Sequence, residues 1–262
     1  SRIELRVPVT GAGEVHTIGR DHAPRLVKTA RILLAMLLKR IVKGVARQHG
    51  FAASFMAKPF ADIAGSGLHI HTSVYDAQGE NIFDQPGQSP AMSDTIRHAI
   101  GGLSATMAEA MAIFAPNANS YRRFRPGAYA PYAPTWGYNH RDVALRIPVS
   151  SGSNRRIEHR VAGADANPYL AMAAVLAGLQ YGIDERCEPG PETPMGAELV
   201  VPEVQLPRRW DSALELFRDS AILPRYLGED YCRAFGLVRQ GECDDFHFHI
   251  PNLDYEWYLR AL

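Results

Sequence analysis

Two histidines one residue apart, His69 and His71, lie in the stretch GSGLHIHTSV at residues 65–74. Because side chains alternate between the two faces of an extended strand, both imidazoles share one face and lie about 7 Å apart. At that spacing one imidazole can bind a metal ion while the other contacts a phosphate. Gly65 and Gly67 leave the preceding backbone bare, so a carboxylate or phosphate can approach its N–H groups. The alternative is an ordinary half-exposed strand, which an isolated pair of this kind usually indicates.

A carboxylate between two guanidinium groups forms a second cluster, in the stretch RRIEHR at residues 155–160. Strand alternation places Arg156, Glu158 and Arg160 on one face. By itself this pattern fits a surface ladder of ion pairs with little energetic value. Arginine binds planar oxyanions through paired hydrogen bonds, and divalent metals accept carboxylate and imidazole ligands. More arginines nearby would therefore favour a site for polyphosphate and an amino-acid carboxylate. Such a site would suit phosphoryl transfer. Five more lie within 25 residues: Arg122, Arg123, Arg125, Arg141 and Arg146.

The composition sets the broad class of protein. Lys plus Arg and Asp plus Glu number 28 each in 262 residues, so no overall charge favours nucleic acid or a membrane as a partner. The 46% apolar fraction is enough for a substantial core. Three cysteines without CxxC spacing fit a reducing compartment, and we expect a cytoplasmic protein. We expect neither a signal peptide nor a transmembrane helix, because the apolar run at 32–38 is shorter than the roughly 20 residues that span a bilayer.

Hydrophobic periodicity and turn residues predict the elements that must position these groups. Ser93 and Asn167 are expected to cap helices. Residues 116–140, rich in Arg, Asn, Tyr and Gly, are expected to form a working loop. Mixed strands and helices without regular alternation favour an α+β fold. The expected elements are a helix over 21–50, strands over 51–57 and 67–76, a helix over 93–114, a hairpin of strands over 143–150 and 155–163, a helix over 166–183, and helices from 211 onward with an aromatic tail docked on the core.

Five motifs occur in order along the chain: KP with GSGLHIH, NSYRRFRPGAYAP, RDVALRIP, RRIEHR and ANPYLAMAA. In these motifs the chain resembles the catalytic domain of the glutamine synthetase superfamily, from about residue 38 to residue 182 and more weakly to the C-terminus. NSYRRF, YNHR and RVAGADANPYL look most like its gamma-glutamylpolyamine (gamma-glutamylputrescine) synthetase branch. The resemblance implies an α+β fold with a curved, mainly antiparallel sheet flanked by helices. It also implies a catalytic domain over 38–262, preceded by an atypical segment over 1–37.

The resemblance implies a two-step ligation, in which ATP phosphorylates the γ-carboxylate of glutamate and an amine then attacks the acyl phosphate. It implies Mg²⁺ or Mn²⁺ as cofactor, and a homo-oligomer in the intact family member. ATP, glutamate and an amine are the expected partners, with no nucleic acid or membrane. By motif position the resemblance implies His69 and Glu158 as metal ligands, His71, Ser73, Arg146 and Arg156 as contacts of ATP and its phosphates, Gly65, Arg123, Tyr129 and Arg160 as substrate contacts, and Arg141, Arg123 and Arg160 as catalytic residues.

Tyr129 departs from the pattern of the ammonia-using members, which place a glutamate at about this point of the loop. A tyrosine is a poor base at neutral pH and brings no negative charge, so an ammonium site is disfavoured. We therefore expect an organic amine, with a polyamine such as putrescine as the leading substrate and ordinary glutamine synthetase activity as the nearest alternative. Tyr132, Trp136 and Tyr138 offer an aromatic wall for an alkylammonium chain, although packing is the commoner role of such residues.

The first segment departs more strongly from the family pattern. In VTGAGEVHTI at 9–18, His16 takes the place of a metal-binding glutamate, and Pro8 takes the place of an upstream acid. Residues 22–61 hold eight basic residues and no acidic one. A frameshift, or another change of the reading frame over residues 5–37, explains this better than a basic nucleic-acid-binding helix. The family's small N-terminal domain has no counterpart in the sequence, so we expect weak or no activity. The rivals are a non-catalytic remnant that binds nucleotide or glutamate, and a guanidino kinase of related fold, which would lack the NPYL helix.

Overall fold

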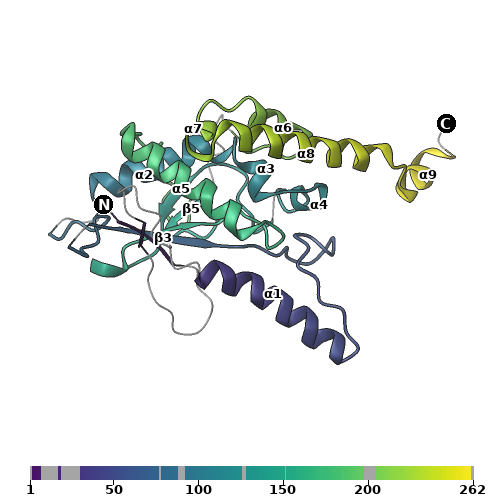
Figure 1. Ribbon diagram of the computed structural model, residues 1–262, viewed down its shortest axis with the longest axis horizontal. Coiled ribbons are helices and arrows are strands. Elements are labelled where there is room, and N and C mark those ends of the chain that lie inside the picture. The colour runs from purple at the N-terminus through teal and green to yellow at the C-terminus, as the bar shows by residue number, and fades with distance from the viewer. Residues whose placement is uncertain are drawn as a thin grey trace.

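Figure 1 shows the computed structural model, which describes residues 2–6, 17–18, 30–76, 78–87, 92–125, 128–150, 152–197 and 205–260. A six-stranded sheet has the strand order β2-β1-β3-β6-β5-β4. Four neighbouring pairs are antiparallel and the β4–β5 pair is parallel, so the predicted mainly antiparallel sheet is confirmed. The strands are β1 (Arg2–Arg6), β2 (Thr17–Ile18), β3 (Ile70–Tyr75), β4 (Trp136–Tyr138), β5 (Leu145–Ile147) and β6 (Ile157–His159).

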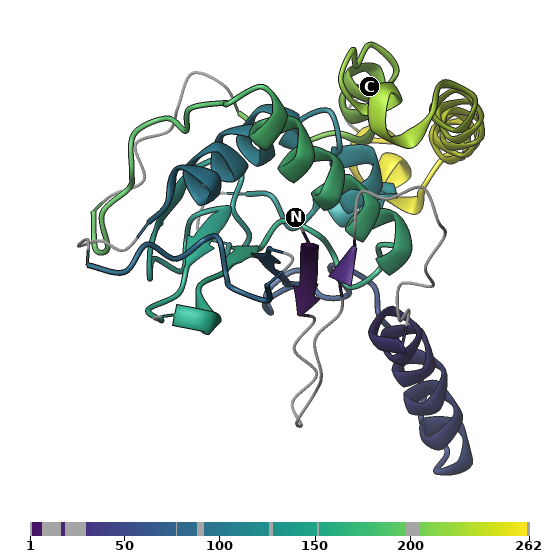
Figure 2. The same cartoon turned by 60° about the vertical axis from the view of Figure 1, so that its left-hand side comes forward.

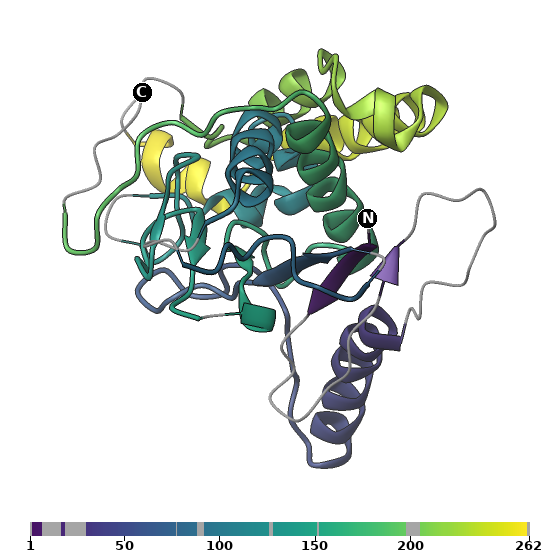
Figure 3. The ribbon, with the colours of Figure 1, turned by 90° about the vertical axis from the view of Figure 1, so that its left-hand side faces the viewer.

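Helices flank this sheet, as the α+β prediction requires. α2 and α5 lie side by side over one face of the sheet, and the C-terminal helices pack beside them (Figures 1 and 2). α1 projects away from the body of the molecule on the other side (Figure 3). The helices are α1 (Ala30–Gln48), α2 (Asp94–Met107), α3 (Met111–Phe114), α4 (Ala118–Tyr121), α5 (Pro168–Asp184), α6 (Trp210–Arg218), α7 (Leu223–Leu227), α8 (Glu229–Phe248) and α9 (Asn252–Tyr258), with a 3₁₀ turn at Gly152–Asn154.

Both predicted helix caps are confirmed. Ser93 Oγ accepts a hydrogen bond from the N–H of Ile96 at the start of α2, and Asn167 caps α5, with Pro168 in its first turn. The apolar faces that follow pack inward, with Ile100 of α2 and Val175 of α5 fully buried. Each cap therefore sets where its helix begins and so which side chains meet the core.

Glycines allow α2 and α5 to approach each other closely. A Cβ added to Gly102 would lie 2.3 Å from the carbonyl oxygen of Gly178 and 2.3 Å from the Cα of Gly182. These are backbone atoms, which cannot rotate away as a flexible side chain can. The two helices can therefore cross at this distance only with glycine at the contact.

Two predicted elements differ from the structure. Residues 51–57 form no strand, because this stretch connects α1 to the loop before β3 and its last carbonyl accepts a hydrogen bond from Ser66 instead of a strand partner. The helix expected over 93–114 is interrupted between Met107 and Met111. A tighter turn, in which the N–H of Met111 bonds the carbonyl of Ala108, separates α2 from α3.

The expected working loop at 116–140 and the aromatic tail also differ in part. The loop contains α4, which a capping box of Asn117 and Ser120 starts, and also β4. The tail does not dock on the core: Trp257 is 62% exposed, because α8 carries α9 beyond the body of the molecule (Figure 1). The first part of the helix expected from residue 21 lies outside the described residues. No described helix has the length and apolar character needed to cross a membrane.

Substitution at the helix crossing tests this packing. We expect Gly102→Ala to lower the free energy of unfolding by about 1–3 kcal/mol, because the added methyl group pushes two backbones apart. Gly44→Ala in α1 is the matched control, since nothing lies within 4 Å of its added Cβ. There alanine should stabilise the helix by up to roughly 1 kcal/mol. Urea unfolding followed by circular dichroism measures both, and equal effects would contradict a tight crossing.

Candidate active site

Glu158 lies in the middle of a row of ionisable residues that runs across three strands. β6 lies between β3 and β5, and Glu158 is paired with His71 on one side and with Arg146 on the other. Directly paired residues place their side chains on the same face of a sheet and within contact distance. The strand register therefore brings together three residues that are far apart in the sequence.

The two oxygens of the Glu158 carboxylate contact three nitrogen-bearing side chains. Arg160 Nη1 donates to Oε1 at 2.7 Å, Arg146 Nη1 donates to Oε2 at 2.9 Å, and His69 Nδ1 lies 2.9 Å from Oε1. The side chain of Glu158 is only 4% exposed. Burial raises the pKa of this carboxyl, but the hydrogen bond with His69 and the charge of Arg160 outweigh burial and hold the pKa well below its usual range. Glu158 is therefore ionised at neutral pH.

His71 lies beside this cluster as a neutral imidazole. Burial lowers the pKa of His71 to about 4, against the opposing charge of Glu158. Its Nδ1 accepts a hydrogen bond from Arg156 Nε at 3.2 Å, and its Nε2 lies 4.0 Å from Glu158 Oε1. The predicted meeting of the histidine pair with the RRIEHR face is therefore confirmed. A surface ladder of ion pairs is wrong, because the carboxylate at its centre is buried.

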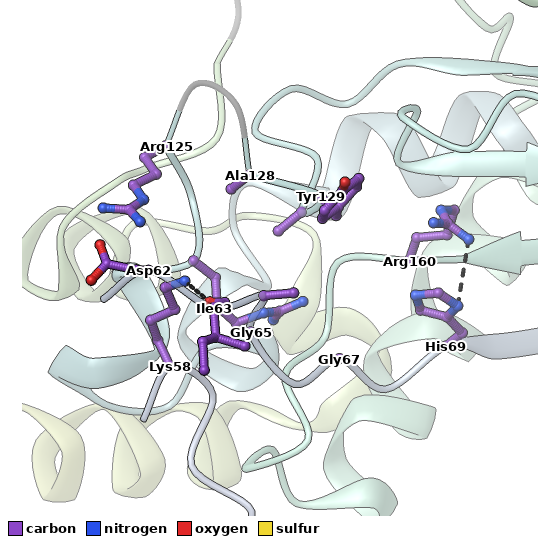
Figure 4. A pocket seen from close by; sticks show the side chains of 13 residues that line it. Lys58, Asp62, Ile63, Gly65, Gly67, His69, Arg125, Ala128, Tyr129 and Arg160 are labelled. Atoms are coloured by element: carbon purple, nitrogen blue, oxygen red, sulfur yellow. Dashed lines mark hydrogen bonds between the residues drawn. The ribbon is translucent and has the colours of Figure 1, made fainter. Parts of the chain in front are cut away.

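A pocket of about 450 Å³ opens beside the cluster formed by Glu158 and its contacts. Figure 4 shows its two ends, with His69 and Arg160 at one and Lys58, Asp62 and Arg125 at the other. Tyr129 lies between them and is 81% exposed at the rim. The pocket therefore joins the strand ends to the two loops that flank them, and it is open to solvent at the tyrosine.

Gly65 and Gly67 make room for a side chain of the protein itself. A Cβ on Gly65 would lie 2.7 Å from the carbonyl oxygen of Ala57 and 2.8 Å from Arg123 Cγ. A Cβ on Gly67 would lie 3.2 Å from Arg123 Nη2. Both glycines and Arg123 line the pocket. The bare backbone at Gly65 and Gly67, which was predicted to make room for a ligand, therefore makes room for the side chain of Arg123. The guanidinium group of Arg123 in turn lines the pocket.

Asp165 stands behind Arg123, and sequence reasoning assigned it no role. Arg123 is 5% exposed and donates to a backbone carbonyl at 3.1 Å. Asp165 Oδ2 accepts hydrogen bonds from Ser120 Oγ at 2.6 Å and from Asn117 Nδ2 at 2.9 Å. Burial lowers the pKa of Arg123, and the charge of Asp165 opposes that shift. Asp165 thus ties the start of α4 to the segment before α5. The sequence feature that could have pointed to Asp165 is its position two residues before the helix cap Asn167.

Three predicted groups lie outside the cluster and the pocket. Ser73 is buried, and its hydroxyl donates to the carbonyl of Arg155 at 2.8 Å, which links β3 to the hairpin. Arg141 is exposed and, within the described part of the chain, contacts neither Glu158 nor the pocket lining. The nucleotide and phosphoryl roles of these two residues stay predictions. Trp136 is buried and its indole N–H donates to a backbone carbonyl at 2.7 Å, while Tyr132 and Tyr138 pack against the core, which favours the packing role over an aromatic wall.

The predicted metal ligands His69 and Glu158 come together, but they make only part of a coordination shell. Across the described ranges, no group of three or more His, Cys, Asp or Glu side chains is placed to hold a metal ion. An ionised carboxylate and an imidazole suit a divalent cation, so the pair fits one in its chemistry. Both carboxylate oxygens already accept hydrogen bonds from arginine. The metal-binding role of the two residues stays a prediction, and they would supply only two of the ligands that a divalent cation needs.

Comparison with known proteins gives a consistent result. The sequence pattern described as "Glutamine synthetase, catalytic domain" matches residues 22–258. The chain is 43% identical over 227 residues to the gamma-glutamylputrescine synthetase PuuA of Escherichia coli (strain K12). The matched region covers 86% of this chain and 47% of that protein. It is also 33% identical over 230 residues to a glutamate–isopropylamine ligase of a Pseudomonas species. That matched region covers 87% of this chain and 50% of that protein.

A solved structure described as a GmaS/ADP complex has a similar fold. It matches with a TM-score of 0.78 at 32% identity, over 87% of this chain and 54% of that one. The predicted catalytic-domain fold is thereby confirmed. The chain spans about half the length of the relatives that it matches.

Removal of the central carboxylate should destabilise the fold. We expect Glu158→Ala to lower the free energy of unfolding by about 3–5 kcal/mol, because the buried Arg160 and the partly buried Arg146 lose their counter-charge. Glu158→Gln keeps one acceptor oxygen and should cost less. Glu188→Ala, which breaks an exposed pair with Arg97, is the matched control, with an expected change below about 1 kcal/mol. Urea unfolding at neutral pH compares them, and similar losses for Glu158→Ala and Glu188→Ala would show that the buried cluster is not a structural constraint.

Proposed function

The chain belongs to the glutamine synthetase family through its catalytic domain, and we propose that it ligates the γ-carboxylate of glutamate to an organic amine at the expense of ATP. The observation that carries this proposal is the basic character of the pocket. Its described lining holds three arginines and one lysine, and one of its ends lies at the Glu158 cluster. ATP is a polyanion and glutamate is an acidic amino acid, and guanidinium groups bind phosphate and carboxylate oxygens in fixed geometry. The names of two relatives, which specify putrescine and isopropylamine, support an organic amine.

The proposed reaction has two steps. In the first, an oxygen of the γ-carboxylate attacks the γ-phosphorus of ATP, the bond from that phosphorus to the bridging oxygen breaks, and ADP leaves. In the second, the lone pair of the amine nitrogen attacks the acyl carbon and forms the C–N bond. The bond from that carbon to the phosphate oxygen then breaks, inorganic phosphate leaves, and the nitrogen loses a proton to solvent. A bound divalent cation, for which we propose Mg²⁺ or Mn²⁺, would neutralise phosphate charge.

Arg123 and Arg160 are the residues that we assign to glutamate and to the transferring phosphoryl group. Both line the pocket and both are largely buried, so their guanidinium groups act in a region of low dielectric constant. Arg160 is aimed by its bond to Glu158, and Arg156 by its bond to His71. Charge moves between oxygens in both steps, so guanidinium groups held in place before the reaction stabilise the transition state without reorganising.

Tyr129 supports an organic amine over ammonia. Its ring stands at the open rim of the pocket, where the amine must enter. A phenol is neutral at neutral pH, so it neither attracts an ammonium ion nor takes its proton efficiently. An amine that brings its own apolar carbons can instead lie against the ring.

A second candidate is a protein that binds nucleotide or glutamate without turnover. The partial donor set around His69 and Glu158 favours it, and for the same reason we propose weak activity for this chain. Calorimetric titration with ATP, with and without Mn²⁺, separates the two functions. Metal-dependent tight binding without any γ-glutamyl product favours the binding protein.

Product formation tests the ligase directly. Incubation with ATP, Mn²⁺, glutamate and putrescine is expected to yield ADP and a γ-glutamyl amide, both detected by mass spectrometry. Arg160→Lys should lower kcat/KM by roughly 100-fold, because lysine cannot provide the same paired donors to a transferring phosphoryl group. Arg233→Ala, on the exposed face of α8, is the control and should leave the rate unchanged. Activity that survives Arg160→Lys in full would exclude the assigned role.

Exchange of the rim tyrosine tests the choice of amine. Tyr129→Glu is expected to shift the ratio of kcat/KM for ammonia over putrescine by about tenfold toward ammonia, since one favourable charge interaction of roughly 1.4 kcal/mol gives that factor. Tyr129→Gln removes the ring without adding charge and is the matched control. If both variants change the ratio equally, the charge at this position does not decide between ammonia and organic amines.

A further inference from the structure

Arg123 is a buried cation in the wall of the pocket. It is 5% exposed, which is less than any other basic residue in the described lining. Its Nη1 donates to the carbonyl of Val161 at 3.1 Å, and a guanidinium group has further N–H donors for a ligand. A charge at this depth is stable only near an opposite charge. The residue that supplies the opposite charge therefore also affects how Arg123 meets a ligand.

Asp165 lies beside Arg123 at a glycine. A Cβ added to Gly163 would lie 2.1 Å from Asp165 Oδ1 and 3.3 Å from Arg123 Nη1. Both charged groups therefore approach the same point, which only a residue without a side chain leaves open. Burial lowers the pKa of Arg123, and Asp165 is the one charged group in the described part of the chain that raises it. Asp165 is therefore the counter-charge of Arg123.

The two oxygens of the Asp165 carboxylate have different surroundings. Oδ2 accepts the hydrogen bonds from Ser120 and Asn117, whereas Oδ1 is buried without a hydrogen-bond partner among the described residues. Oδ1 is also the oxygen that approaches Arg123. Lys39 is a second cation near this carboxylate, but its Nζ donates to a backbone carbonyl at 3.3 Å. Oδ2 thus fixes the start of α4, and Oδ1 is left to act on Arg123 through its charge.

Both interactions act on the position of the same guanidinium group. α4 ends two residues before Arg123, so the hydrogen bonds of Oδ2 place the backbone, and the charge of Oδ1 draws the side chain inward. Without that charge, a guanidinium group at the wall of an open pocket would gain by turning toward water. We propose that Asp165 is a positioning residue, whose charge holds Arg123 at the pocket wall for a carboxylate of glutamate. This inference rests on the proposed ligase function and on its assignment of Arg123 to glutamate.

Asp165→Asn separates the charge from the hydrogen bonds. The side-chain carbonyl of asparagine can accept both bonds that Oδ2 accepts, so the start of α4 keeps its anchor. The amide carries no negative charge, so Arg123 loses its counter-charge. A residue that served only to anchor α4 would tolerate this change. A positioning residue would not, and the effect would appear in the binding of glutamate.

Initial-rate kinetics with varied glutamate and saturating ATP, Mn²⁺ and putrescine measure this effect. We expect Asp165→Asn to raise the KM for glutamate about tenfold, at the low end of the roughly 10–100-fold loss that removal of a supporting group causes at metal sites. The kcat should change less than about twofold, because the lost contact binds glutamate alike before and during the reaction. Lys39→Gln, which removes the other cation near Asp165, is the matched control and should leave the KM unchanged.

A double-mutant cycle tests whether Asp165 acts through Arg123. In an Arg123→Gln background, Asp165→Asn should raise the KM for glutamate less than about twofold, because the group that it positions is already absent. An unchanged KM in Asp165→Asn, or the same increase in both backgrounds, would overturn the inference. Circular dichroism checks that each variant is folded, and Asp165→Ser, which places no amide beside Arg123, replaces an Asp165→Asn chain that does not fold.

Failure of the ligase function gives a different result, since no γ-glutamyl product then forms in any variant. Calorimetric titration of glutamate, in the presence of ADP and Mn²⁺, then decides the inference. A dissociation constant that rises about tenfold in Asp165→Asn, but not when Arg123→Gln is also present, supports it. Equal dissociation constants in the wild-type and Asp165→Asn chains, or no binding of glutamate to the wild-type chain, overturn it.

Discussion

The carboxylate of Glu158 is buried in the sheet, with the guanidinium groups of Arg146 and Arg160 and the imidazole of His69 against its oxygens. Buried charges are tolerated only when each has a partner, because each loses its hydration on folding. Each of these four groups therefore depends on the others for its counter-charge or hydrogen-bond partner. Once β6 is in register between its neighbours, the directions of the two arginines follow, and Arg160 faces the pocket.

The described lining of the pocket holds more basic than acidic side chains. Arg160 lies at the strand end, and Lys58 and Arg125 lie with Asp62 at the loop end, so both ends hold basic side chains that can bind oxyanions. The ring of Tyr129 lies between the two ends. A lining of this charge suits the acidic substrates of the proposed ligation.

The site combines strands, whose geometry hydrogen bonding fixes, with loops that need separate anchors. Asp165 holds the start of α4 and lies near Arg123, while Asn119 in α4 holds the loop before β3 through the backbone of Lys58. On the far side, the glycine contact at Gly102 lets α2 and α5 pack closely over the sheet. Loop residues can therefore face the pocket with nearly the same precision as strand residues.

Local chemistry alone determined much of this protein. Helix caps at Ser93 and Asn167 and the alternation that puts Glu158 with Arg156 and Arg160 follow from propensity and period, which need no distant partner. The motifs likewise indicated the family, which the comparisons confirmed. Only the tertiary structure decided that Asp165 stands behind Arg123, that Ser73 bonds a backbone carbonyl, and that 51–57 is no strand. Such outcomes depend on burial and on pairing between residues far apart in the chain, and a periodic pattern carries no record of which segment will be the partner.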